Sequence, residues 1–427
     1  MTRLLGAGLI WFGIFIGASA LAAPMQATTP ESVGLSSQRL ERITEKFTAD
    51  IAAGIIPGAV ILVARDGMVA YHQALGYRDR AAGLAMQRDS IFRIYSMTKP
   101  IFSVGAMALV EEGNLYLSEP IAKYLPAFAE MTVGVATIDP ATGAENLEIV
   151  PADRPIKVHD LLRHTSGLTY AFIGKGPVKA LYKEAGVDDF SRARTVADYA
   201  DELAKLPLLW QPGTTWDYSR STDVLGALME QAANQPVDEF LRARVLAPLG
   251  MDDTDFWVPP AKQDRVAQPQ PDLQTGEIDD LLDVTEKPAM FAGGHGLMST
   301  AADYARFCQM LLNGGVLDGA RILGPKTVAY MASDHLGGEI SKAGTLYLPG
   351  PGYGFGLGFG VRLATGESPW PGSKGEYYWG GYAGTYFWID PVERMVVVYM
   401  MQSVKHRLHY RMLLRNLVMQ AIIEPKS

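Results

Sequence analysis

The sequence predicts an α+β fold in which one antiparallel sheet is flanked by helices from the two chain ends and interrupted by a mostly helical insertion. Strand patterns occur near both ends of the 427-residue chain, whereas its middle shows helix patterns and long loops. An amphipathic helix pattern precedes the first strands, and another follows the last ones. We expect an α/β part at about residues 30–95 and 296–427, and a helical part at about 96–295.

The first elements are a helix and a hairpin. Apolar side chains at helical spacing predict an amphipathic helix from Ser36 to about Gly54. Two apolar runs follow, Ala59–Ala64 and Val69–Gly76, and Asp66-Gly67 between them is a strong turn dipeptide. These two runs are therefore predicted to form the first strand pair.

A buried central helix is predicted from Ser96 to about Glu112, where Gly113 can end it. Pro100 is tolerated because the first-turn N–H groups have no partner inside a helix. Apolar side chains lie on every side of this helix, which is typical of burial; they are Ile101, Phe102, Val104, Ala106, Met107, Ala108, Leu109 and Val110.

The remaining elements follow from caps and apolar runs. The predicted helices are Asp160–Arg163, Thr195 to Leu206, one capped by Ser221 or Thr222, one capped by Thr300 with Asp303 and ending at Asn313, and Leu408 to Ile423. The predicted strands are Gly354–Leu363, Gly384–Asp390 and Met395–Gln402. Little strand pattern is visible between Leu115 and Pro288.

Composition and charge narrow the function classes. The chain is 48% hydrophobic and 20% charged, which is enough for one large or two medium cores. The formal net charge is −8 and no basic run stands out, so we expect no nucleic-acid partner. The seven histidines show no ligand spacing, so neither a metal nor a cofactor is expected. The single cysteine, Cys308, excludes an intrachain disulfide and lies in an apolar helix pattern typical of core packing.

Residues 1–23 resemble a secretory signal peptide. Arg3 precedes an apolar run from Leu4 to Ile16, and small-x-small cleavage patterns follow at Ala18-Ser19-Ala20 and Ala20-Leu21-Ala22. The alternative is an uncleaved anchor, although the run is short for a membrane span. We expect an exported protein, periplasmic or secreted, with a folded domain at 24–427 and no membrane attachment after cleavage.

Ser96 and Lys99 are the first candidate catalytic pair. Positions i and i+3 share one helix face, so the Lys99 amine can reach the Ser96 hydroxyl. A serine beside an amine that can take its proton is the minimum apparatus for acyl transfer, and the helix start favours negative charge there. The alternative is a plain N-cap at Ser96 and a solvated Lys99, and the spacing alone favours that alternative.

Two later segments can complete such a site. Tyr218, on a loop before a helix, carries a phenol that can bridge Ser96 and Lys99. Trp379-Gly380-Gly381-Tyr382 precedes a predicted strand, and paired glycines allow backbone to come close to a substrate carbonyl.

In this order, Ser96-Met97-Thr98-Lys99, Tyr218-Ser219-Arg220 and Trp379-Gly380-Gly381 resemble the three motifs of the serine β-lactamase and penicillin-binding-protein superfamily. Leu161–Leu168 and Gly293–Thr300 are similar to further segments of that family. The second motif departs from Tyr-x-Asn and the third from Lys-Thr-Gly. With these departures the chain looks like the β-lactamase-like carboxylesterases, the family VIII esterases.

The resemblance implies the β-lactamase/D,D-peptidase-like fold and hydrolysis of a small-molecule ester through an acyl-enzyme on Ser96. Lys99 and Tyr218 would be the general base and acid, and which of them is the base stays open. The backbone N–H groups of Ser96 and Tyr382 would form the oxyanion hole. Trp379, Gly380 and Gly381 would bind substrate.

Two alternatives remain. One is a β-lactamase or D,D-peptidase acting on β-lactams or peptidoglycan peptides, and the other is a catalytically silent binding protein on the same fold. The absence of Gly-x-Ser-x-Gly argues against an α/β-hydrolase. We expect His295 to be structural or part of the pocket wall, and His164 and Ser166 to stabilise a turn.

Overall fold

The computed structural model describes residues 24–143, 145–188, 190 and 192–426. The predicted signal peptide at 1–23 lies outside the described residues. Within the described ranges, no helix combines the length and the apolar character needed to span a bilayer.

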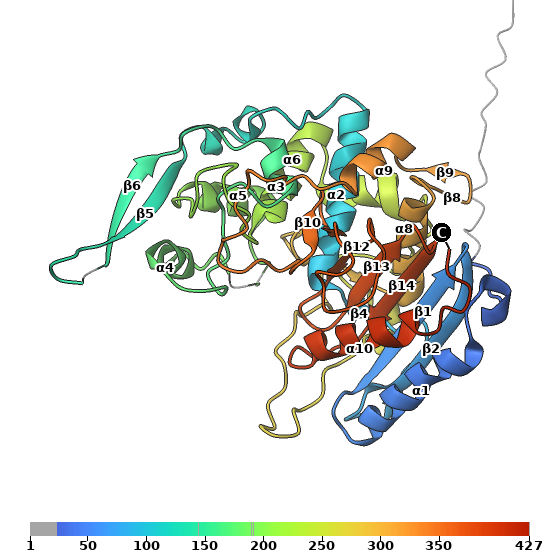
Figure 1. The fold of residues 1–427 in the computed structure, drawn as a ribbon. Coiled ribbons are helices and arrows are strands. Elements are labelled where there is room, and N and C mark those ends of the chain that lie inside the picture. Colours follow the sequence, from blue (N-terminus) through green and yellow to red (C-terminus); the bar gives the residue numbers. More distant parts are fainter. Residues whose placement is uncertain (1–23, 144, 189, 191, 427) are drawn as a thin grey trace, which may run out of the picture.

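One eight-stranded antiparallel sheet organises the fold (Figure 1). Its order is β10-β11-β12-β13-β14-β1-β2-β3, and β1 pairs with β14 so that Val60 lies opposite Met400. The first and last strands are therefore neighbours, and the predicted assembly of one sheet from both chain ends is confirmed. The strands are β1 (Gly58–Arg65), β2 (Met68–Asp79), β3 (Leu84–Ala85), β10 (Tyr353–Phe355), β11 (Gly360–Arg362), β12 (Tyr377–Gly380), β13 (Tyr386–Asp390) and β14 (Met395–Met400).

The two faces of this sheet bury alternate side chains against different helices. Ile61 of β1 and Val397 of β14 pack with the terminal helices α1 (Ser37–Ala52) and α10 (Arg407–Met419), which lie side by side in Figure 1. Leu62 and Val398, one position along each strand, pack into the core on the opposite face. That core contains the helices α2 (Thr98–Glu111), α6 (Ser221–Ala233) and α8 (Ala301–Leu312).

The α2 helix is buried along its length, as its all-round apolar pattern predicts, since every residue from Thr98 to Leu109 is buried. A short 3₁₀ turn, η2 (Tyr95–Met97), precedes it and carries Ser96. Tyr95 has a left-handed backbone with φ +44°, and its phenol oxygen accepts the Leu282 N–H at 3.0 Å. A non-glycine residue in this conformation is strained, and such strain is common beside functional groups.

The remaining elements form the helical part and its connections. The helices are α3 (Val158–Leu162), α4 (Pro177–Glu184), α5 (Val196–Ala204), α7 (Val237–Leu241), α9 (Pro325–Met331) and the π-helical turn η5 (Arg242–Leu246). The 3₁₀ turns are η1 (Pro30–Val33), η3 (Ile121–Lys123), η4 (Pro126–Phe128) and η6 (Pro260–Arg265). The short strand pairs are β4 (Phe92–Arg93) with β7 (Met298–Ser299), and β8 (Val316–Leu317) with β9 (Ala320–Arg321).

Two strand predictions were wrong. The middle of the chain contains an antiparallel hairpin, β5 (Thr132–Ile138) with β6 (Glu145–Pro151), which extends away from the body in Figure 1. The predicted single strand at 354–363 is two strands, β10 and β11, because Gly358 turns the chain with φ +102°.

One smaller prediction is incomplete and another is wrong. The third motif precedes the strand β13, as predicted, but Trp379 and Gly380 are themselves part of β12, the strand that pairs with β13. Neither Ser221 nor Thr222 is the N-cap of α6. Arg220 takes that position without a side-chain cap bond, and Ser221 is the first residue of the helix.

Candidate active site

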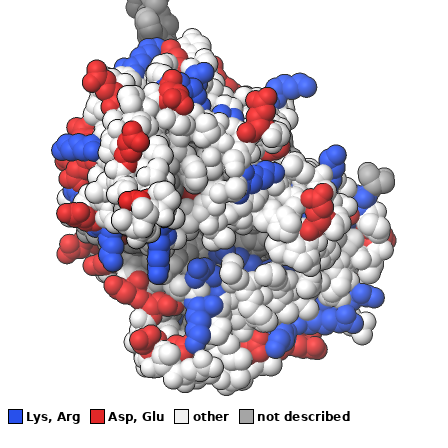
Figure 2. All heavy atoms as spheres, turned by 60° about the vertical axis from the view of Figure 1, so that its left-hand side comes forward, with Lys and Arg blue, Asp and Glu red and all other residues white. Residues whose placement is uncertain are grey.

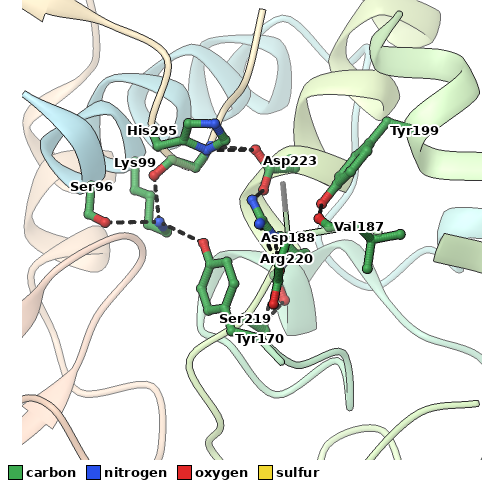
Figure 3. Close-up of polar contacts among 12 residues, drawn as sticks. Ser96, Lys99, Tyr170, Val187, Asp188, Tyr199, Ser219, Arg220, Asp223 and His295 are labelled. Atoms are coloured by element: carbon green, nitrogen blue, oxygen red, sulfur yellow. Dashed lines mark hydrogen bonds and ion pairs between the residues drawn. The ribbon is translucent and has the colours of Figure 1, made fainter. Parts of the chain in front are cut away.

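Ser96 lies in η2 and Lys99 in the first turn of α2, and the Lys99 Nζ is 3.3 Å from the Ser96 Oγ (Figure 3). Lys99 is 1% exposed, so it is not a solvated helix lysine. The N-cap of α2 is Met97 and receives no side-chain cap bond, so Ser96 is not a plain cap either. The alternative that the spacing alone favoured is therefore wrong.

Three acceptors surround the Lys99 amine. Besides Ser96, its Nζ donates to the Gly294 carbonyl at 2.7 Å and to the Tyr170 phenol oxygen at 3.2 Å. Burial lowers the pKa of Lys99 from 10.5 to about 7, and the negative charge of Asp223 opposes this shift. The amine can therefore lose its proton near neutral pH, which an exposed lysine does not do.

Tyr218 lies beside this pair, on the loop that precedes α6. The Lys99 Nζ stands 4.6 Å above its ring centroid. Burial raises the pKa of the Tyr218 phenol, while hydrogen bonds with Ser96 and Trp379 oppose the increase. The structure thus brings the hydroxyl, the amine and the phenol from two distant segments into one corner.

Trp379 supports the phenol from the other side. It is 4% exposed on β12, and its indole Nε1 donates to the Tyr218 phenol oxygen at 3.2 Å. Its ring also packs edge-on against Phe355 at 5.3 Å between centroids. Contact of Trp379 with substrate stays a prediction.

The two glycines after Trp379 are places of close backbone approach. A Cβ on Gly380 would lie 2.6 Å from the Arg411 guanidinium carbon, and one on Gly381 would overlap the Ile94 carbonyl. The Thr385 hydroxyl also donates to Ile94 O at 3.3 Å, which fixes this loop against the residues before Ser96. Their role in binding substrate stays a prediction.

The Tyr382 backbone follows directly on this loop. Its ring packs edge-on against Tyr95 at 5.6 Å between centroids. Among the residues that the structure describes, its N–H has no hydrogen-bond acceptor. The placement is compatible with the predicted oxyanion hole of Ser96 and Tyr382, which remains a prediction.

Sequence reasoning missed three groups that contact or influence Lys99. Tyr170 was only one of several aromatic residues near the motifs, and Gly294 was only part of a glycine-rich turn. Asp223 is fully buried on α6 and accepts the Gly294 N–H at 2.8 Å. In the sequence, only the position of Asp223 five residues after Tyr218 connects it with the site. That spacing becomes informative only when the structure shows α6 packed against the turn that contains Gly294.

Two histidines lie near the site, His164 and His295, and burial lowers the pKa of both. His164, with φ +57°, packs 4.9 Å from the Tyr218 ring and makes a 3.2 Å hydrogen bond with Ser219. Ser166 bonds Ser221 at 2.8 Å, so this turn braces the start of α6. Burial, with Arg220, Lys99 and Arg192, lowers the pKa of His295 well below its usual value, which keeps the ring neutral.

Among the residues that the structure describes, neither a cluster of metal ligands nor a reactive thiol is found. Within the described ranges, no group of three or more His, Cys, Asp or Glu side chains could hold a metal ion. Cys308 is buried in α8 and burial raises the pKa of its thiol well above the usual value.

Positive and negative side chains are interspersed over the face shown in Figure 2.

The fold and the meeting of Ser96, Lys99 and Tyr218 are typical of the serine hydrolase superfamily that includes β-lactamases and penicillin-binding proteins. The Beta-lactamase family model matches residues 41–417, and the chain belongs to that family.

Three relatives refine this assignment. An uncharacterized protein of Mycobacterium tuberculosis is 37% identical over 361 residues, 82% of this chain and 86% of the relative. Esterase EstB of Burkholderia gladioli is 36% identical over 236 residues, 55% of each protein. The solved structure of EstCE1, a hydrolase with promiscuous acyltransferase activity, has a TM-score of 0.75 and 28% identity over 91% of this chain and 99% of its own.

Proposed function

We propose that the protein is a serine carboxylesterase that forms an acyl-enzyme on Ser96. The observation that carries this proposal is the meeting of Ser96, a buried Lys99 with a pKa of about 7, and Tyr218 in one corner. The likeness to EstB and EstCE1 supports an esterase within the family.

In the acylation step, the Ser96 Oγ attacks the ester carbonyl and Lys99 accepts the hydroxyl proton. The structure favours Lys99 over Tyr218 as the base, because burial lowers the pKa of the amine and raises that of the phenol. Tyr218 then donates its proton to the leaving alcohol and regains one from Lys99. Water attacks the acyl-enzyme in the second half-reaction, and the same pair returns the proton to Ser96.

The developing oxyanion would accept hydrogen bonds from the backbone N–H groups of Ser96 and Tyr382. Two such donors, fixed before the reaction, stabilise charge that appears only in the transition state. The close approach of Gly381 to Ile94 and the contact of the Tyr382 ring with Tyr95 support a position of the second donor near the first.

The third motif favours neutral esters over β-lactams or peptides. Trp379 stands where the antibiotic-degrading members have a lysine, and its indole is turned to the Tyr218 phenol. The site therefore lacks the motif cation that would pair with a substrate carboxylate. Turnover of p-nitrophenyl acetate or butyrate, compared with nitrocefin, tests this choice, and faster nitrocefin turnover would favour the β-lactamase alternative.

Substitution of the nucleophile tests the assignment itself. Ser96→Ala is expected to abolish hydrolysis of p-nitrophenyl butyrate and labelling by a fluorophosphonate probe. Full activity of this variant would refute the assignment. Failure of the probe to label the unaltered protein, together with no ester turnover, would favour the silent binding protein.

We also propose that the protein is exported, on the signal-like pattern of residues 1–23. Mass spectrometry of the N-terminus of the protein recovered from the periplasm or medium tests this, and a full-length cytoplasmic product would contradict it.

A further inference from the structure

Two buried residues of opposite charge, Arg220 and Asp223, lie on the side of Lys99 that faces away from Ser96 (Figure 3). Arg220 takes the third position of the second motif, where the antibiotic-degrading relatives have an asparagine. Arg220 is 1% exposed, and Asp223, one helical turn later, is 0% exposed. Their side chains are 3.5 Å apart, between the Arg220 Nη1 and the Asp223 Oδ2. Buried charges of this kind are costly unless they are paired and hydrogen-bonded.

Asp223 reaches Lys99 through one backbone group. Its Oδ1 accepts the Gly294 N–H at 2.8 Å, and the Gly294 carbonyl accepts the Lys99 Nζ at 2.7 Å. Gly294 also has no room for a side chain, because a Cβ there would lie 2.8 Å from Asp223. The carboxylate thus fixes the carbonyl that orients the amine.

Arg220 acts on Lys99 through Tyr170, another hydrogen-bond acceptor of the amine. Its guanidinium carbon stands 4.6 Å from the Tyr170 ring centroid, and the Tyr170 phenol contacts the Lys99 Nζ. The guanidinium is held by Asp188, whose Oδ1 accepts from Nε at 2.8 Å. The other Asp188 oxygen accepts the backbone N–H of Ala171, next to Tyr170.

We propose that Arg220 and Asp223 are paired positioning residues that hold Tyr170 and Gly294, two of the hydrogen-bond acceptors of Lys99, in place and set the balance of charge around its amine. This inference rests on the proposed role of Lys99 as the base.

The other titratable groups around Lys99 are neutral near pH 7. Burial lowers the pKa values of the two histidines and raises those of the two tyrosines; these residues are His164, His295, Tyr170 and Tyr218. Asp223 and Arg220 are left as the charged side chains that act on Lys99, the first raising its pKa and the second lowering it. Removal of the Asp223 charge should therefore lower the titration midpoint of Lys99, and removal of the Arg220 charge should raise it.

The test is a direct titration of Lys99 in protein labelled with [ε-¹³C]lysine, with Lys99→Met identifying the resonance. Asp223→Asn keeps an oxygen that can accept from Gly294, and it should lower the Lys99 midpoint by about one pH unit or more. Arg220→Gln should raise the midpoint by about one pH unit or more. The double variant should return close to the starting value.

Unshifted midpoints in both folded single variants, or shifts in the same direction, would overturn the proposal. If Arg220→Gln does not fold, Asp223→Asn decides the matter, since a lower midpoint supports the proposal and an unchanged or higher one refutes it. Glu393→Gln is the matched control, because it removes a buried partner of Arg65 elsewhere in the fold and should leave the Lys99 titration unchanged.

In the pH profile of kcat/KM, the rise on the acidic side should shift in these variants by the same amount as the Lys99 midpoint. Residues with a purely structural role would not shift it. Arg220→Lys keeps the charge but loses the flat guanidinium, so this rise should stay in place while kcat falls. Since the titrations need no turnover, failure of the esterase proposal, seen as an active Ser96→Ala variant, is distinguishable from failure of this inference.

Discussion

Replacement of Lys99 by methionine should change the pH dependence of stability in a defined direction. Burial lowers the pKa of the amine from 10.5 to about 7. At about 1.4 kcal/mol per pH unit, holding the charged amine inside therefore costs about 5 kcal/mol below pH 7. Between pH 7 and 10.5 the unfolded chain binds more protons at Lys99 than the folded protein, so this cost falls as the pH rises.

The perturbation is Lys99→Met, which keeps an unbranched side chain of similar length but removes the charge. The free energy of unfolding of each protein is measured by urea titration at about pH 6.5 and pH 9.5. The stability of the unaltered protein, relative to the variant, should rise by about 3 kcal/mol between the two pH values. Lost packing contacts that do not depend on the protonation of Lys99 contribute equally at both pH values and therefore cancel.

Lys183→Met, at an exposed position of α4, controls for removal of one positive charge. A difference between Lys99→Met and the unaltered protein that stays constant within about 0.5 kcal/mol, the usual spread for surface substitutions, would refute the reasoning. It would mean that Lys99 keeps its proton throughout this range, and the amine could then not be the base near neutral pH.

Three further predictions concern activity. The kcat/KM for p-nitrophenyl butyrate should rise with pH through a midpoint of about 7, because only neutral Lys99 can accept the proton; a flat profile from pH 6 to 8 would contradict this. Tyr218→Phe should lower kcat by about 10²–10⁴-fold through loss of the acid and leave that midpoint in place, whereas near-normal turnover would exclude the phenol from proton transfer. Gly381→Ala should push the loop off the Ile94 carbonyl and lower kcat by about 10²-fold or more as one oxyanion donor is lost. KM should change little in this variant, with folding checked by circular dichroism, and unchanged kcat would argue against the Tyr382 N–H as a donor.

The sequence was sufficient for the features that depend on local pattern. The apolar side chains all around the Ser96 helix predicted that this helix is buried, and the two sets of terminal strands predicted one shared sheet. The β5–β6 hairpin was missed, although Thr132–Ile138 contains alternating β-branched residues, because no short turn dipeptide of the Asn-Gly type joins the two strands. The single strand expected at 354–363 failed for a related reason, since one glycine reverses the chain there.

The candidate site was predictable only as far as its three motifs extend. Tyr170 and Gly294 contact Lys99 across sequence separations of 71 and 195 residues. No local pattern reports such a contact, because it depends on how the helical part packs over α2. Asp223 was hidden for a different reason: a lone aspartate in the first turn of a helix is typical of a solvated end, and only its full burial shows otherwise.

The site contains two energetically unfavourable features, and its position at the start of the buried helix α2 explains how the fold tolerates them. Tyr95 holds a left-handed backbone, which costs about 1–3 kcal/mol, and the buried charge of Lys99 costs more. Both lie at the end of a helix whose residues from Thr98 to Leu109 are all buried, where each large apolar side chain contributes about 1.5–3 kcal/mol. About two to five such side chains therefore offset the strain and the buried amine together. The same groups placed on a solvated loop would relax, since Lys99 would return to water and regain its proton, and the Ser-Lys pair would lose its base.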